Sequence, residues 1–381
     1  MQKSGKVNLI RVVIKALILF ILVNLLWVII APQVGFLSIY SHIVPGRQRF
    51  PFGEVPELAY NFSLDNIDAM FESHEIESGY LNEEYSVFII GDSSVWGTLL
   101  KPEETLAGQL NQLELIHADS GLPVRFYNFG YPTLSLTKDV MVILESLKPY
   151  EPDMVLWMVT LESMPWSLQQ RSPIVQNNPE RLYQLEHWYG LPIKKSGQPI
   201  EFDTFWEETL VGQRREIADV LRLQLYGLLW GATGIDQYYP EEYTPAAWDL
   251  EADDSYYSLT PETVSEDQFA FEMIQGAIDI ASDVLPGVEV VIVNEPILVS
   301  QGVNSDIRYN FYYPRWVYDK YRVMMMEQSE KNQWNYFDLW DLVPPSQFTN
   351  SAIHLTPEGE RILAGAIMDS LKRQEIWEFS E

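Results

Sequence analysis

Five short apolar runs, separated for the most part by helical patterns, constrain the fold of this 381-residue chain more than any other feature. Each run has the length and the β-branched or aromatic content of a buried strand. The runs are Tyr85–Ile90, Val124–Asn128, Met154–Thr160, Val288–Asn294 and Asn335–Asp338. The helical patterns lie at Leu136–Leu147, Glu266–Val284 and Arg315–Glu330, and a last helix begins at Thr356 and Pro357. This alternation predicts an α/β fold with a parallel sheet that helices cover on both faces.

One long stretch interrupts the alternation. More than a hundred residues separate the third run from the fourth, and most of them show no rhythm of strands and helices. We therefore predict a core domain formed by residues 81–163 and 285–381, with residues 164–284 as an insertion or cap over one edge of the sheet. In this division residues 32–80, which contain four prolines, form a lead-in segment.

The N-terminal part of the chain has the pattern of a membrane anchor. Residues 12–31 form an apolar run of about 20 residues, which is enough to cross a bilayer as one helix. Its single charge, Lys15, lies near the start and can reach the headgroups, and Trp27 suits the opposite interface. Cations are frequent in residues 1–11, whereas none follows the run until Arg47. The positive-inside rule then predicts a single-pass protein of the cell membrane, with residues 1–11 cytoplasmic and the main domain extracytoplasmic. A cleaved signal peptide is the alternative.

The charge and the residue types exclude several classes of function. The formal net charge is −29, from 54 acidic and 25 basic residues, and such a surface repels nucleic acid. Without cysteine the chain has no disulfide, no thiolate zinc site and no thiol nucleophile. We find neither metal-ligand spacing nor a glycine-rich phosphate pattern, so the sequence indicates no metal and no cofactor. It identifies no protein partner.

A serine follows the first strand where a helix is expected to begin. The strand runs into Gly91-Asp92-Ser93-Ser94-Val95-Trp96-Gly97, and Gly91 lets the chain turn sharply. Ser93 is then placed at the carboxyl edge of the sheet, where ligands bind in open parallel sheets and where a helix start favours developing negative charge. Ser93 is therefore a candidate nucleophile, and Asp92 is a candidate substrate contact. A plain turn capped by Asp92 or Ser93 is the alternative.

One histidine is expected at the same edge of the sheet. His354 lies in the loop between the last strand and the last helix, and that loop also leaves the carboxyl edge. A serine hydroxyl is a weak nucleophile until a neutral imidazole accepts its proton, so His354 is the candidate general base. The other histidines are placed less well for this role; they are His42, His74, His117 and His187.

Three blocks of sequence together resemble the SGNH/GDSL hydrolase superfamily. Residues 91–97 are similar to its GDSxxxG block, residues 126–132 to its second block, and His354 before a Pro-Glu-Gly helix start to its final histidine block. The resemblance covers about residues 81–163 and 285–375, and the blocks follow one another in the family's order.

This resemblance implies a fold and a reaction. The fold is a flavodoxin-like three-layer αβα sandwich, and the reaction is ester hydrolysis or acyl transfer with Ser93 as nucleophile and His354 as base. The N–H groups of Ser93 and Gly130 would form the oxyanion hole.

The sequence departs from the family's pattern at two positions. Glu162 falls where the third block has an asparagine that donates to the oxyanion, and a carboxylate there would repel an oxyanion unless it is protonated or turned away. The family's acid lies three residues before the histidine, where this chain has Ser351, and Asn350 precedes it. The imidazole would then be oriented by Asn350, Ser351, a backbone carbonyl, or a charge from Asp338 or Asp341.

A polar loop after the fourth strand adds candidate substrate contacts. Arg308, Asn310 and Arg315 lie there among tyrosines, and they could hold a polar or anionic substrate at the carboxyl edge. Glu162 could bind the hydroxyl of an acyl acceptor. An ordinary helix start is the alternative for the loop.

Two functional hypotheses remain. The first is a serine esterase or O-acyltransferase that acts outside the cytoplasmic membrane on an acyl ester or an acylated carbohydrate, such as a polysaccharide. The second is a catalytically inactive subunit of the same fold that binds or assembles in a membrane-associated polysaccharide system.

Overall fold

The structure is a computed structural model that describes residues 8–32, 83–235 and 255–377. It also describes residues 239–240, 242–243 and 379–380 and the single residues Ile43, Ile67, Phe71, His74 and Ile76. The predicted lead-in at residues 32–80 lies almost entirely outside the described residues.

The centre of the molecule is a parallel sheet of five strands. They are β1 (Tyr85–Gly91), β3 (Val124–Gly130), β4 (Met154–Val159), β5 (Glu289–Asn294) and β6 (Asn335–Asp338). The spatial order is β3-β1-β4-β5-β6, and every neighbouring pair is parallel. In chain order this is 2-1-3-4-5, the flavodoxin-like arrangement, so the predicted fold class is confirmed.

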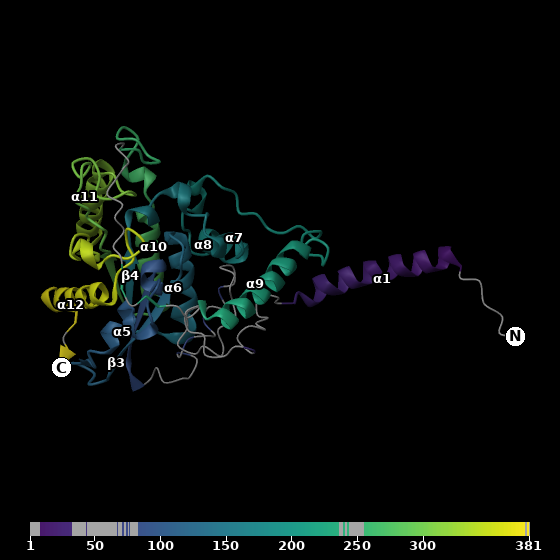
Figure 1. Ribbon diagram of the computed structural model, residues 1–381, viewed down its shortest axis with the longest axis horizontal. Coiled ribbons are helices and arrows are strands. Elements are labelled where there is room, and N and C mark those ends of the chain that lie inside the picture. The colour runs from purple at the N-terminus through teal and green to yellow at the C-terminus, as the bar shows by residue number, and fades with distance from the viewer. Residues whose placement is uncertain are drawn as a thin grey trace.

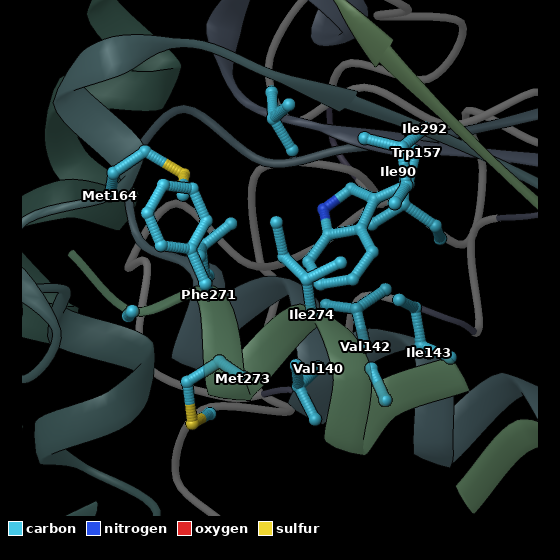
Figure 2. Packing of buried hydrophobic residues seen from close by; sticks show 14 of the residues in the cluster. Ile90, Val140, Val142, Ile143, Trp157, Met164, Phe271, Met273, Ile274 and Ile292 are labelled. Carbon is cyan, nitrogen blue, oxygen red and sulfur yellow. The ribbon is translucent and has the colours of Figure 1, made fainter. Parts of the chain in front are cut away.

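Successive side chains of the strands enter two separate cores. Phe88 and Ile90 belong to one apolar cluster, whereas Val87 and Ile89 belong to the other, as the two-residue period of a strand requires. The first cluster joins the sheet to α6 (Leu136–Tyr150), α10 (Phe271–Val284) and α11 (Arg315–Asn332), and Trp157 fills its centre (Figure 2). The second joins the sheet to α5 (Leu106–Asn111) and α12 (Pro357–Arg373).

The segment predicted as an insertion is partly integrated into these layers. Helix α10 packs on α6 and is the crossover helix between β4 and β5. Helices α7 (Pro173–Gln176) and α8 (Pro179–His187) also contact α6. Helix α9 (Arg214–Thr233) instead lies on the side of the body from which the N-terminal helix extends (Figure 1). Helix α10, although it belongs to the segment predicted as an insertion, thus packs with the helices that cover the sheet.

The remaining elements are short. A small antiparallel pair joins β2 (Ile116–His117) to β7 (Phe379–Ser380), and α4 (Ser93–Trp96) follows β1. Short 3-10 helices connect the larger elements; they are η4 (Pro102–Glu104), η5 (Leu161–Ser163), η6 (Trp166–Leu168), η7 (Ile193–Ser196), η9 (Glu266–Gln268) and η10 (Pro345–Gln347).

The N-terminal apolar run forms one helix, α1 (Leu9–Ile30). It begins three residues before the predicted run and ends one residue before its end. Its 22 residues span about 33 Å, close to the thickness of a bilayer's hydrocarbon core. Among the described residues it is the one helix that is long and apolar enough to cross a membrane.

Two glycines allow α4 to approach the ends of β1 and β3. Gly91 and Gly130 lie side by side at the carboxyl ends of these strands. A Cβ atom on Gly91 would lie 2.5 Å from Val95 Cγ2, and one on Gly130 would lie 2.1 Å from the backbone nitrogen of Trp96. No side chain fits at either contact, so the turn that carries Ser93 requires glycine at both positions.

We expect Gly130→Ala to lower the free energy of unfolding by about 1–3 kcal/mol, because the new methyl group must displace the backbone of α4. The comparison is Gly365→Ala on α12, where nothing lies within 4 Å of the added Cβ. That change should stabilise the protein by about 0.5–1 kcal/mol, because alanine favours a helix interior. Denaturant unfolding of both variants measures the two effects. Equal stability of the two variants would contradict the packing argument.

Candidate active site

Ser93 occupies the turn between β1 and α4. The Asp92 carboxylate caps this helix, since its Oδ1 accepts the backbone N–H of Ser94 at 2.8 Å. Strand β1 has β3 on one side and β4 on the other, so its end is the point where the strand order reverses. Ligands of open α/β sheets bind in the crevice at such a point.

The loop after β6 brings His354 back across the sheet to Ser93. Its backbone is held by hydrogen bonds from Thr349 N–H to the His354 carbonyl at 2.8 Å and from Leu298 N–H to the Ala352 carbonyl at 2.7 Å. The distance between Ser93 Oγ and His354 Nε2 is 2.8 Å. The two side chains therefore meet in a hydrogen bond, as the topology of the sheet predicts.

Asn350 contacts the other nitrogen of the imidazole. Its Oδ1 lies 2.9 Å from His354 Nδ1, and an amide oxygen can only accept a hydrogen bond. The proton of the neutral ring therefore lies on Nδ1, which leaves Nε2 free to accept the proton of Ser93. Asn350 thus takes the place that an acidic residue has in a complete triad.

Of the other three candidate side chains for this position, two are engaged elsewhere and one is exposed. Ser351 Oγ accepts the N–H of Ile353 at 3.3 Å. Asp338 forms an ion pair with Arg322, with hydrogen bonds of 2.9 and 2.7 Å. Asp341 is exposed in the turn after β6. The structure therefore supplies an amide, rather than a carboxylate, beside the histidine.

Burial determines the protonation of His354. It lowers the pKa of the imidazole to about 4, and no neighbouring charge opposes the shift. At neutral pH the ring is therefore uncharged and can accept a proton. The imidazolium that forms during a reaction would gain only a dipole, and no countercharge, from Asn350.

One of the two N–H groups predicted to form the oxyanion hole is engaged within the protein. The Gly130 N–H donates to Asn128 Oδ1 at 2.9 Å, while Asn128 Nδ2 donates to the Val95 carbonyl at 2.8 Å. Asn128 thus joins β3 to α4 and engages the N–H group that was expected to face an oxyanion, which corrects this prediction. The Ser93 N–H lies in the first turn of α4, where no intrahelical acceptor exists.

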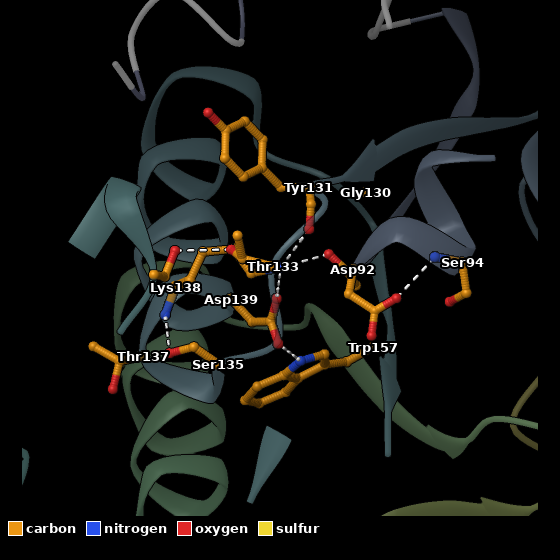
Figure 3. Close-up of polar contacts among 12 residues, drawn as sticks. Asp92, Ser94, Gly130, Tyr131, Thr133, Ser135, Thr137, Lys138, Asp139 and Trp157 are labelled. Carbon is orange, nitrogen blue, oxygen red and sulfur yellow. Dashed lines mark hydrogen bonds and ion pairs between the residues drawn. The ribbon is translucent and has the colours of Figure 1, made fainter. Parts of the chain in front are cut away.

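A buried ion pair supports the turn from below (Figure 3). Lys138 Nζ donates to the carbonyls of Gly91 at 2.6 Å and Tyr131 at 3.2 Å, and it pairs with Asp139 Oδ1 at 2.6 Å. The Trp157 indole donates to the second oxygen of Asp139 at 3.1 Å. Lys138 thereby ties together the ends of β1 and β3. This pair was not predicted from the sequence, although a Lys-Asp dipeptide in a helix with many apolar residues is a usable signal.

A second buried contact holds Ser94. Its hydroxyl donates to Glu295, which follows β5. Burial raises the pKa of Glu295 well above its ordinary value, and the nearby Asp92 raises it further. Burial also raises the pKa of Asp92 to about 6. Asp92 is thus a buried helix cap rather than the substrate contact that we expected, and Glu295 was not predicted.

Glu162 is held by tyrosines at the end of β4. Tyr257 donates its hydroxyl to Glu162 Oε2 at 2.9 Å, and Tyr312 is a second hydrogen-bond partner. Burial raises the pKa of Glu162 against the opposing effect of these hydrogen bonds. The carboxyl group is therefore satisfied within the protein.

The polar loop after β5 is held together by the residues predicted to bind substrate. Arg308 Nε donates to the Asn310 carbonyl at 3.1 Å, and Asn310 Nδ2 donates to the Leu298 carbonyl at 2.8 Å. The Arg315 guanidinium lies over the Tyr309 ring, 4.3 Å from its centre. Arg308 and Asn310 are buried and have a structural role in the loop, whereas Arg315 is half-buried, and its contact with a substrate stays a prediction. Within the described part of the chain, no group of three or more His, Asp or Glu could hold a metal ion.

Comparison with known proteins gives structural similarity at low sequence identity. No family model and no curated protein matches the sequence. Est24, a carbohydrate acetylesterase from Sinorhizobium meliloti, is 13% identical, with 76% of this chain and 100% of that chain covered and a TM-score of 0.38. A catalytic mutant of Axe2, an acetylxylan esterase from Geobacillus stearothermophilus, is 11% identical, with 75% of this chain and 94% of that chain covered and a TM-score of 0.35. The chemistry of the site is therefore inferred from its own residues.

We expect Asn350→Asp to raise the pKa of His354 above about 4, because a carboxylate beside Nδ1 stabilises the imidazolium. A titration of the imidazole signals by NMR measures the shift, with His354→Ala to assign the resonance. Ser351→Asp is the matched control, since Ser351 bonds to Ile353 rather than to the ring. A larger shift in the control would show that the loop has another register.

Lys138→Met should lower the free energy of unfolding by about 3–5 kcal/mol, because it leaves Asp139 as an uncompensated buried carboxylate. The double variant Lys138→Met, Asp139→Leu removes both charges and should recover most of the loss. Denaturant unfolding followed by near-UV circular dichroism measures both. A single variant as stable as the unmodified chain would mean that the ion pair does not support the sheet edge.

Proposed function

We propose that the chain is a serine esterase or O-acyltransferase of the SGNH/GDSL type. The observation that carries this proposal is the row Ser93–His354–Asn350, with contacts of 2.8 and 2.9 Å at the two ring nitrogens. A nucleophile, a base and a group that fixes the tautomer of the base lie in the order that acyl transfer requires.

In the proposed reaction Ser93 Oγ attacks the carbonyl carbon of an acyl ester while its proton passes to His354 Nε2. A new Oγ–C bond forms, the bond to the leaving alcohol breaks, and His354 returns the proton to that alcohol. Water or an acceptor hydroxyl then attacks the acyl carbon and passes its proton to His354 Nε2. The Oγ–C bond breaks, His354 returns the proton to Ser93 Oγ, and the acid or the new ester leaves. The Ser93 N–H stabilises the oxyanion; a second donor requires the Gly130 N–H to leave Asn128.

The missing carboxylate sets the expected rate. In a well-studied triad, replacing the aspartate with asparagine lowered turnover by about 10⁴-fold through the wrong tautomer. Here the amide oxygen accepts from Nδ1, so the correct tautomer is retained and only the countercharge is lost. We therefore expect turnover that is slow but well above background.

The location suggests the substrate class. With residues 1–11 in the cytoplasm and α1 across the membrane, the catalytic domain would lie outside, where acylated carbohydrates of the cell surface are available. We also propose that the core comprises residues 81–163 and 285–381 together with α10, so that residues 164–270 form the insertion.

The alternative is a subunit of the same fold that binds without catalysis. Two observations favour it: the Gly130 N–H is engaged by Asn128, and Glu162 replaces a neutral donor. A bound ligand would then occupy the crevice without an acyl-enzyme, so covalent trapping of Ser93 separates the two hypotheses.

We expect a fluorophosphonate probe to label the unmodified chain at Ser93 and to fail with Ser93→Ala. Ser94→Ala is the matched control and should retain labelling, because the Ser94 hydroxyl is directed to Glu295. Mass spectrometry of the labelled peptide identifies the serine. A folded protein that remains unlabelled across the pH range would lead us to abandon the enzyme in favour of the binding subunit.

A further inference from the structure

Helix α9 carries apolar side chains on its outer face as well as on the face toward the protein. Leu223 and Leu228 are half-buried, whereas Leu225 and Leu229 are 63% and 61% exposed. Leu221 continues the same outer face one turn earlier. A surface helix of a soluble domain confines its apolar stripe to the face toward the core, and a helix that is apolar on both sides needs an apolar partner on each. This helix therefore has the pattern of one whose outer face meets an apolar medium.

The apolar surface continues into the segment before α9. Phe202, Phe205 and Val211 are exposed there, and Trp206 is 76% exposed. These residues and the outer face of α9 belong to one stretch of the chain, and we call their exposed apolar side chains the 202–233 surface. Large exposed apolar patches mark sites of interaction with a membrane or another protein.

Hydrogen bonds attach this surface to α1. The Trp27 indole donates to Gln213 Oε1 at 2.8 Å, and the Val211 N–H donates to Asn24 Oδ1 at 3.2 Å. Asn24 is the one buried residue of α1, and Phe205 and Trp206 line an apolar groove beside it. The 202–233 surface thus contacts the part of the chain proposed to cross the membrane.

The position of this contact along α1 indicates how deep Val211 would lie in a membrane that α1 spans. Asn24 lies six residues before the end of the helix at Ile30, a distance of about 9 Å along its axis. Amphipathic helices that lie in a membrane interface insert their apolar face by about 5–10 Å. If α1 spans the bilayer, residues at Val211 therefore lie at the depth of an interfacial helix.

We propose that the 202–233 surface is a second membrane contact, which lies in the lipid interface beside the outer end of α1. This inference rests on the membrane-spanning role of α1 in the proposed function, and it is independent of the catalytic chemistry. The exposed leucines of α9 meet the acyl chains. The three arginines of residues 202–233 are outnumbered by five acidic residues, and Arg222 is paired with Asp219, so the contact rests on apolar burial rather than on charge.

A second copy of the chain is the other occupant that an apolar helix could have. The depth of Val211 along α1 favours lipid, because a protein partner at Val211 would have to enter the hydrocarbon boundary beside α1. The test must therefore distinguish lipid from protein contact.

The absence of cysteine allows single labels to be placed without removing native thiols. Leu225→Cys and Leu229→Cys are labelled with an environment-sensitive fluorophore in the full chain, which is reconstituted in phosphatidylcholine vesicles containing phosphatidylglycerol. Val323→Cys, an exposed valine on α11, is the matched control, and Leu19→Cys reports α1 itself. Quenching by spin-labelled lipids and by aqueous iodide is measured at each position.

We expect lipid quenching severalfold stronger at positions 225 and 229 than at 323, and weak iodide quenching there. Lipid quenching at 19 with strong iodide quenching at 225 and 229 would overturn the second contact alone. Iodide quenching at 19 as well would overturn the membrane span and with it the proposed location. Protection from both quenchers at 225, together with disulfide cross-linking of unlabelled Leu225→Cys, would assign the surface to a second copy and overturn the inference.

Discussion

The close approach of α4 to the ends of β1 and β3 is the constraint on which the site depends. Gly91 and Gly130 leave no space for a side chain, so the backbone of α4 rests directly on two strand ends. Asn128 and Lys138 then fix the same ends by hydrogen bonds to backbone groups. A rigid strand edge is what holds a nucleophile within hydrogen-bond reach of a base carried by a distant loop, because errors of about 1 Å are costly in catalysis.

The electrostatics of the site follow from burial rather than from paired charges. Asp92 and Glu295 lie in the interior below Ser93, and burial raises the pKa of both. Asp92, with a pKa of about 6, is still largely a carboxylate at neutral pH, whereas the stronger shift favours the neutral form of Glu295. A neutral Glu295 does not repel an oxyanion, whereas a second carboxylate would. The same burial keeps His354 uncharged. In the proposed reaction, the fixed dipoles of α4 and Asn350 would stabilise the charge that develops.

The sequence predicted the features that periodicity and topology control. The apolar runs predicted the five strands, and the parallel arrangement of the strands predicted that Ser93 and His354 lie at the carboxyl edge of the sheet. It did not resolve features that depend on the path of a loop: Asn350 and Ser351 are adjacent, and only the backbone bonds around His354 determine which one faces the ring. Arg308 shows a related limit, because a polar side chain after a strand serves equally well to bind a ligand or to satisfy the carbonyls of its own loop.

A second membrane contact would change what the anchor does. One helix tethers a domain but leaves it free to rotate and tilt, so a crevice at the sheet edge would sample many directions. Two contacts at different points of the body remove most of this freedom. The remaining surface is strongly acidic and is repelled by anionic lipids, which opposes any other face lying on the membrane. Attraction at the 202–233 surface and repulsion elsewhere would together select one orientation, and the crevice beside Ser93 would then face a fixed layer above the membrane rather than the whole of the surrounding solution.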